Sequence, residues 1–147
     1  MSDPFTFSLL DKPWLPFIRT DGTSVVLGVR EALAQAHMLD IVAGDLPLQT
    51  AAIYRLLLAL VLRIYAPADS DDWGDLWQAQ TFDMEPAKAY FDRWAGRFDL
   101  FDQRHPFMQR DERRVEPKST VNLLQDRASG NNATLFDHSL ESDGTLL

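Results

Sequence analysis

The segment from Gln49 to Tyr65, QTAAIYRLLLALVLRIY, constrains the fold more than any other part of the sequence. Arg55 and Arg63 are its only charged residues, and its apolar residues occupy every side of a helix with 3.6 residues per turn. This pattern predicts a helix that protein covers on most sides. A membrane-spanning helix is the alternative, but crossing a bilayer takes about 20 apolar residues, and this run is shorter and is interrupted by two arginines. We therefore favour a buried central helix.

Composition is typical of one folded domain or part of one. The chain has 147 residues, of which 46% are hydrophobic and 24% are charged. It has no cysteine, which excludes a disulfide framework and a cysteine-based zinc site. The N-terminal residues show neither a secretory signal nor a membrane anchor. We expect a cytoplasmic protein with no membrane partner.

The net charge of -8 argues against a protein that coats nucleic acid without sequence preference, because binding to phosphates depends on Lys and Arg. The charge is unevenly spread, since residues 104–127 contain six basic and four acidic side chains. Two interpretations stay open at this point. The segment is either a solvated loop of mixed charge or a locally basic surface that meets a polyanion.

Short apolar runs near the N-terminus predict a small antiparallel sheet. The dipeptide Asp21-Gly22 lies between two runs of strand-forming residues, 17–20 and 23–27, which is the typical signal of a tight hairpin. Gly28 is a suitable N-cap for a helix over about Val29–Met38. The fold class predicted is therefore α+β, mostly helical, with a small N-terminal antiparallel sheet around a buried central helix.

Two further helices are predicted after the central one. Pro47 suits the first turn of the central helix, and Pro67 ends it. A helix over Trp73–Gln78 follows an acidic start, and another begins near Glu85. The second of these carries an aromatic stripe that we expect in the core, formed by Tyr90, Phe91, Trp94 and Phe98.

Signatures of familiar enzymes are missing from the sequence. It contains no P-loop, no Rossmann glycine pattern, no His-Glu-x-x-His and no Gly-x-Ser-x-Gly. A metal-dependent phosphoesterase that uses His105, Asp137 and His138, with Asp102 nearby, is an alternative, because carboxylate and imidazole together bind metal ions. These histidines lack ligand spacing, so we expect no catalytic residue, no metal site and no cofactor. An acidic protein-interaction domain with an aromatic surface is a further alternative.

The segment Ser129–His138, SGNNATLFDH, has residues that could contact nucleic acid. Asparagine side chains offer hydrogen-bond donors and acceptors, Gly130 allows close backbone approach, and Phe136 offers a flat face for a base step. The same composition is also typical of an asparagine-rich turn. Residue chemistry alone favours the turn.

Seven segments together resemble the N-terminal part of one protein family. They cover nearly the whole chain in the family's order, and they are 7–16 (FSLLDKPWLP), 30–33 (REAL), 43–47 (AGDLP), 55–59 (RLLLA), 97–101 (RFDLF), 106–109 (PFMQ) and 128–138 (ASGNNATLFDH). The family is CasA, the large subunit of Cascade, the type I-E CRISPR surveillance complex.

The resemblance implies a non-catalytic subunit that recognises the protospacer-adjacent motif (PAM) of foreign double-stranded DNA, aids target binding and recruits the helicase-nuclease. The implied partners are the other Cascade subunits, CRISPR RNA, double-stranded target DNA and that helicase-nuclease. The resemblance also makes 129–138 a nucleic-acid-binding loop, so this interpretation replaces the simple turn. The loop residues concerned are Gly130, Asn131, Asn132, Thr134, Phe136, Asp137 and His138.

Asp137 and His138 depart from the family pattern, since some members have Val and Asn at these positions. The resemblance further implies that residues 1–147 are the N-terminal part of a CasA-like domain. The remainder of that domain and the family's C-terminal four-helix bundle would then lie beyond Leu147.

Overall fold

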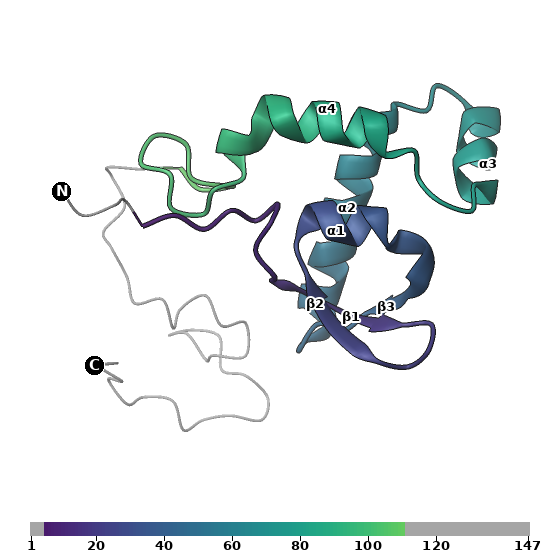
Figure 1. The fold of residues 1–147 in the computed structure, drawn as a ribbon, viewed down its shortest axis with the longest axis horizontal. Helices are drawn as coiled ribbons and strands as arrows, with labels where there is room; N and C mark the ends of the chain where they lie inside the picture. Colours follow the sequence, from purple (N-terminus) through teal and green to yellow (C-terminus); the bar gives the residue numbers. More distant parts are fainter. Residues whose placement is uncertain (1–4, 111–147) are drawn as a thin grey trace, which may run out of the picture. The chain divides into compact units, whose positions relative to one another are not determined.

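The computed structural model describes residues 5–110, which form the α+β fold predicted from the sequence (Figure 1). Helix α2 lies between a small sheet and helix α4, and it contacts both. The elements in chain order are β1 (Leu15–Arg19), β2 (Ser24–Leu27), α1 (Val29–Ala34), the 3-10 turn η1 (Ala36–Met38), β3 (Leu39–Val42), α2 (Pro47–Tyr65), α3 (Ser70–Gln78), α4 (Met84–Trp94) and the 3-10 turn η2 (Ala95–Arg97).

The hairpin predicted at Asp21-Gly22 is confirmed. Strands β1 and β2 pair antiparallel, with Leu15 opposite Leu27, and the turn between them contains Gly22 at φ +84°. The Asp21 carboxylate accepts hydrogen bonds from the hydroxyl and the amide of Thr23, at 2.6 and 2.9 Å. These two donors, the hydroxyl foremost, hold the pKa of Asp21 below its usual value. The turn is therefore closed by its own side chains.

The third strand, β3, is not predicted from the sequence. The helix expected over Val29–Met38 ends at Ala34, and the chain passes through η1 into β3, which pairs antiparallel with β1. The strand order in the sheet is β2-β1-β3. Pairing with β1 buries Val42, which is 3% exposed. A run of four residues is too short for its own periodicity to reveal this tertiary pairing.

Helix α2 is attached to the outer edge of β3 by one hydrogen bond. The Ala43 amide donates to the carbonyl of Pro16, so the adjacent Val42 amide points away from β1. The Tyr54 hydroxyl accepts from that Val42 amide at 3.1 Å. An edge amide that would otherwise need another partner is thereby satisfied from α2.

The core lies among the sheet, α1, α2 and α4. Its largest fully buried side chain is Phe91, whose ring meets that of Phe98 edge-on with centroids 5.9 Å apart. Phe98 in turn stacks on Phe107 at 5.4 Å. Tyr90 and Trp94 pack against this core while partly exposed. The aromatic stripe predicted for the last helix is confirmed as core.

Helix α2 is less covered than predicted. Pro47 stands in its first turn and Ala66 ends it in a left-handed conformation at φ 45°, so its bounds agree with the prediction. Within residues 5–110, however, Ile53 and Leu60 are the buried residues of the helix, and Leu58 is 50% exposed. The prediction that protein covers α2 on most sides was therefore wrong within residues 5–110. The sheet and α4 pack on the side that contains Ile53 and Leu60 and leave Leu58 exposed.

By length and composition alone, α2 could cross a membrane, and 11% of its most apolar 18 residues are buried. A single helix of this kind is weak evidence for a membrane span, and core helices of soluble proteins that pass the same test are mostly buried.

We predict that Phe91→Ala lowers the free energy of unfolding by about 3–5 kcal/mol, because it removes a fully buried aromatic ring and leaves a cavity. Urea unfolding followed by circular dichroism measures the change. Trp77→Ala is the matched control, since Trp77 is 88% exposed and its loss should cost less than about 0.5 kcal/mol. Equal effects of the two substitutions would contradict this account of the core.

Candidate functional site

The predicted nucleic-acid-binding loop lies outside the described residues. This applies to all seven of its residues, and also to most of the mixed-charge segment 104–127. The loop stays a prediction from the sequence. Two residues of the metal-site alternative, Asp102 and His105, do lie within the described part of the chain. The described residues also show which surfaces the fold offers to a partner.

Asp102, a member of the proposed metal site, serves as a turn residue. Its carboxylate accepts hydrogen bonds from the amides of His105 and Arg104, at 2.5 and 2.9 Å. These amides, that of His105 foremost, hold the pKa of Asp102 below its usual value. Among residues 5–110, no group of three or more histidine, aspartate or glutamate side chains could hold a metal ion. The local hydrogen bonds thus explain Asp102 without a metal.

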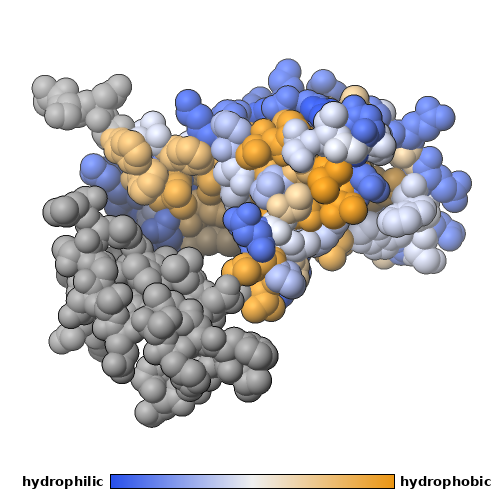
Figure 2. Space-filling view, turned by 90° about the horizontal axis from the view of Figure 1, so that it is seen from below, coloured by the Kyte–Doolittle hydropathy of each residue, from blue (hydrophilic) through white to orange (hydrophobic). Residues whose placement is uncertain are grey.

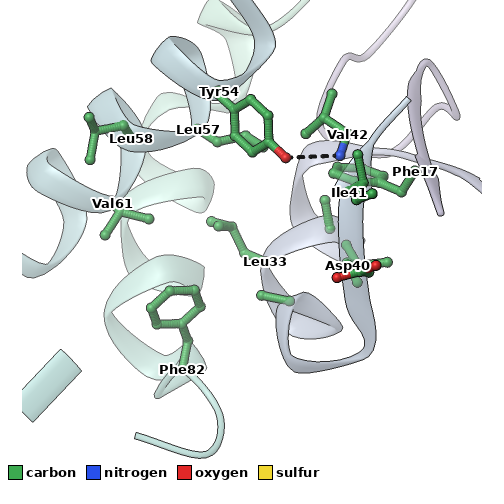
Figure 3. A pocket seen from close by; sticks show the side chains of 13 residues that line it. Phe17, Leu33, Asp40, Ile41, Val42, Tyr54, Leu57, Leu58, Val61 and Phe82 are labelled. Carbon is green, nitrogen blue, oxygen red and sulfur yellow. Dashed lines mark hydrogen bonds between the residues drawn. The ribbon is translucent and has the colours of Figure 1, made fainter. Parts of the chain in front are cut away.

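An apolar cleft separates α2 from β3 and α1 (Figure 3). Its volume is about 280 Å³, which is room for a large side chain rather than for an extended ligand. Figure 3 shows Leu33, Leu57 and Val61 around its interior, with Phe82 at one end. The Tyr54 hydroxyl already bonds to Val42, and Asp40 stands at the β3 side of the cleft. The lining suits an apolar contact rather than acid–base chemistry.

A larger groove of about 570 Å³ lies along another side of α2. Trp14 forms one wall and is held in place because its indole N–H donates to the carbonyl of Leu9 at 2.8 Å. Met108, which is 83% exposed, lies on the lining together with Phe107. The polar groups of the lining come from Gln49 and Arg55. Apolar residues thus line hollows on both sides of α2. Figure 2 shows hydrophobic groups between hydrophilic ones on one face of the molecule.

A third hollow, between the N-terminal segment, α1 and α4, is lined by both charged and apolar residues, among them Arg30 and Leu10. The Arg30 guanidinium pairs with Asp11 at 3.3 Å and Asp92 at 3.4 Å, and it lies over the Phe91 ring, 5.2 Å from the centroid. Both carboxylates are largely exposed, so each ion pair contributes little free energy on its own. Arg30 therefore joins three parts of the chain, which explains it without a ligand.

Two of the segments that carry the family resemblance lie side by side. Ser8 forms a β-bridge with Asp99, and the Leu9 amide donates to the carbonyl of Phe98 at 2.8 Å. The Asp99 carboxylate also accepts from the amide of Phe7 at 3.3 Å. A third contact involves Gly28, where an added Cβ would stand 2.5 Å from the Leu10 carbonyl oxygen. Residues 7–10 thus pack against residues 98–99 and against Gly28. These packing contacts give the residues a structural role.

The family described as CRISPR-associated protein Cse1 matches residues 8–146 of this chain. A curated relative, CRISPR-associated protein CasA/Cse1 of Thermus thermophilus, is 38% identical over 139 residues. That match covers 93% of this chain and 28% of the relative. The chain therefore spans little more than a quarter of the length of this relative.

Solved structures give the same result. The crystal structure of Cse1 from Acidimicrobium ferrooxidans is 38% identical, with a TM-score of 0.71, over 74% of this chain and 21% of that one. A chain of a structure described as a CRISPR RNA-guided surveillance complex is 28% identical, with a TM-score of 0.74, over 88% of this chain and 29% of that one. The fold is thus one found in CRISPR-associated proteins. The chain belongs to the Cse1 family, also called CasA, and corresponds to its N-terminal part.

We predict that Asp102→Asn destabilises the fold at pH 7 by an amount that disappears in acid. Since the folded-state pKa of Asp102 is lowered from 3.8, its contribution is fully present above that value and is lost as the pH falls through the folded-state pKa. Urea midpoints of both proteins at about pH 7, 4.5 and 2.5 measure the difference. Asp21→Asn should behave alike. A difference that stays constant over the whole acid range would show that the charge of Asp102 plays no part.

Proposed function

We propose that this chain is the N-terminal part of the large subunit of a type I-E Cascade complex, and that this subunit is non-catalytic. The observation that carries the proposal is the family match over residues 8–146, together with the similarity to a chain of an RNA-guided surveillance complex. In the proposed role, the subunit recognises the PAM of foreign double-stranded DNA, aids target binding and recruits the helicase-nuclease. Its other partners are the remaining Cascade subunits and CRISPR RNA, in the cytoplasm and away from membranes.

The acidic charge of the chain agrees with a limited contact to DNA. In RNA-guided complexes, pairing with the guide supplies sequence specificity, and protein reads only a short duplex motif that starts strand separation. Such a subunit needs a local contact surface rather than a strongly basic coat. The segment 104–127, in which basic residues outnumber acidic ones, and the loop that follows it are the parts of this sequence that suit that contact.

Within the loop, we assign the base-stacking or wedging role to Phe136. Gly130, Asn131, Asn132 and Thr134 supply backbone approach and hydrogen-bonding groups beside it. An aspartate facing phosphates would repel them, so the role that suits Asp137 is to orient His138. The binding loop then works through one aromatic face supported by neutral polar groups.

We predict that Phe136→Ala weakens target-DNA binding by about 5- to 150-fold, because aromatic–base stacking contributes about 1–3 kcal/mol per base. The host is a full-length subunit in which residues 8–146 replace the matching part of the Thermus thermophilus relative. It is assembled with CRISPR RNA and the other subunits, and binding is titrated over a panel of PAM sequences at fixed salt.

Phe136→Tyr keeps the aromatic face and should retain binding. Trp77→Ala removes an exposed aromatic ring outside the loop and should leave the dissociation constant unchanged. An unchanged dissociation constant for Phe136→Ala at matched salt would reject the role of the loop. Failure of the unsubstituted host to join the RNA-bound complex would reject the proposed function itself.

A further inference from the structure

The exposed side of α2 carries a heptad pattern. Leu48, Arg55 and Leu62 follow one another at intervals of seven residues, and Ala51 and Leu58 lie three residues after the first two. All five are exposed. This a/d spacing is the pattern by which one helix packs lengthwise against another. We call these five residues the α2 seam.

Both flanks of the α2 seam favour a helical partner. Ala52 and Ala59 lie beside the seam and line the same groove as Phe107 and Met108. Small side chains there allow the backbone of a second helix to approach closely. On the other flank, Leu58 lines the cleft toward Ile41, which is 48% exposed (Figure 3). A helix on the seam would therefore meet apolar residues on either side.

We propose that the α2 seam is the docking site of an amphipathic helix that places a carboxylate opposite Arg55. We further propose that this helix belongs to the part of a CasA/Cse1 subunit that the present chain does not span. The proposal rests on family membership rather than on nucleic-acid binding. Arg55, at the middle of the seam, forms no ion pair within residues 5–110, so a carboxylate on the partner would complete its interactions.

The lengths of the relatives support this occupant. This chain spans 28% of the Thermus thermophilus protein, 21% of the Acidimicrobium ferrooxidans structure and 29% of the chain in the surveillance complex. Each relative thus has more than twice as many residues outside the shared region as within it. The segment 55–59, which contains the middle of the seam, is also one of those that carry the family resemblance.

Arg55 disfavours the two other occupants of such a face. The seam runs from Leu48 to Leu62 with Arg55 at its centre, so in-register self-pairing brings two Arg55 side chains together whether the helices run parallel or antiparallel. Like charges in an apolar seam destabilise the pair. In a bilayer, an arginine at the helix centre costs about 2.5–3.5 kcal/mol on insertion scales. A helix with a carboxylate has neither penalty.

The test uses thiol labelling, because the chain has no cysteine. Ala59→Cys places a thiol beside the seam, and Ala89→Cys places one at an exposed helical alanine on α4. Each is made in this chain alone and in a cysteine-free full-length subunit where residues 8–146 replace the matching part of the Thermus thermophilus relative. We expect labelling at position 59 to be at least tenfold slower in the full-length subunit, with position 89 unchanged.

A charge reversal tests the proposed carboxylate. Arg55→Glu should restore fast labelling at position 59 in the full-length subunit, whereas Arg63→Glu, on the same helix but outside the seam, should not. Equal labelling at position 59 in both hosts would overturn the proposal. So would equal protection of positions 59 and 89, because that would indicate burial without preference for the seam.

Two measurements on the chain alone test the two other occupants, which are a second copy of the chain and a bilayer. Light scattering and labelling over a concentration series detect self-pairing, and vesicles of phosphatidylcholine and phosphatidylglycerol detect membrane insertion. Protection of position 59 that rises with chain concentration, or on adding vesicles, would overturn the proposal. None of these assays contains RNA or DNA, so their outcome is separate from that of the proposed function.

Discussion

A helix that is apolar on every side must be covered on more than one side to be stable in water, and α2 imposes this requirement on the rest of the structure. The described fold meets it in part. Sheet, α1 and α4 cover the side that contains Ile53 and Leu60. The Tyr54 hydroxyl fixes the helix to the edge of β3, and the Tyr65 hydroxyl donates to the carbonyl of Asp83 just before α4. One side of α2 is therefore covered, while the opposite side stays exposed from Leu48 to Leu62.

Contacts distant in sequence hold this arrangement together. The N-terminal segment runs from its bridge at Asp99 to the turn at Gly28, so residues 7–12 touch both the end of the aromatic core and the start of α1. Arg30 adds a link from α1 to Asp92 on α4. The charged groups of these contacts are paired with one another near the surface rather than directed into a buried cavity. These contacts thus join the N-terminal segment, α1 and α4 within the unit described by residues 5–110.

Local signals predicted most elements, and tertiary contacts account for the exceptions. The Asp-Gly turn and Pro47 at a helix start act within a few residues, so sequence alone revealed them. Helix α3 was predicted over Trp73–Gln78 but begins at Ser70, where the Asp69 carboxylate accepts from the amides of Asp71 and Asp72. Strand β3 forms because β1 offers an edge, and the burial of α2 depends on neighbours far along the chain. Hydrophobic periodicity reports that a helix is apolar all round, but not which part of the molecule covers each side. The loop at 129–138 was reached through resemblance, since its residues alone favoured a turn.

Arg55 shows how one charged residue separates interpretations that apolar residues leave equal. The leucines and alanines of the exposed face of α2 would suit a bilayer, a second copy or another helix almost equally well. An arginine at the centre of the same face is expensive in a bilayer and repels its own copy, yet it pairs well with a carboxylate of a different chain segment. The specificity of this surface therefore depends on its least apolar residue, as polar residues at the a positions of coiled coils determine which helices pair.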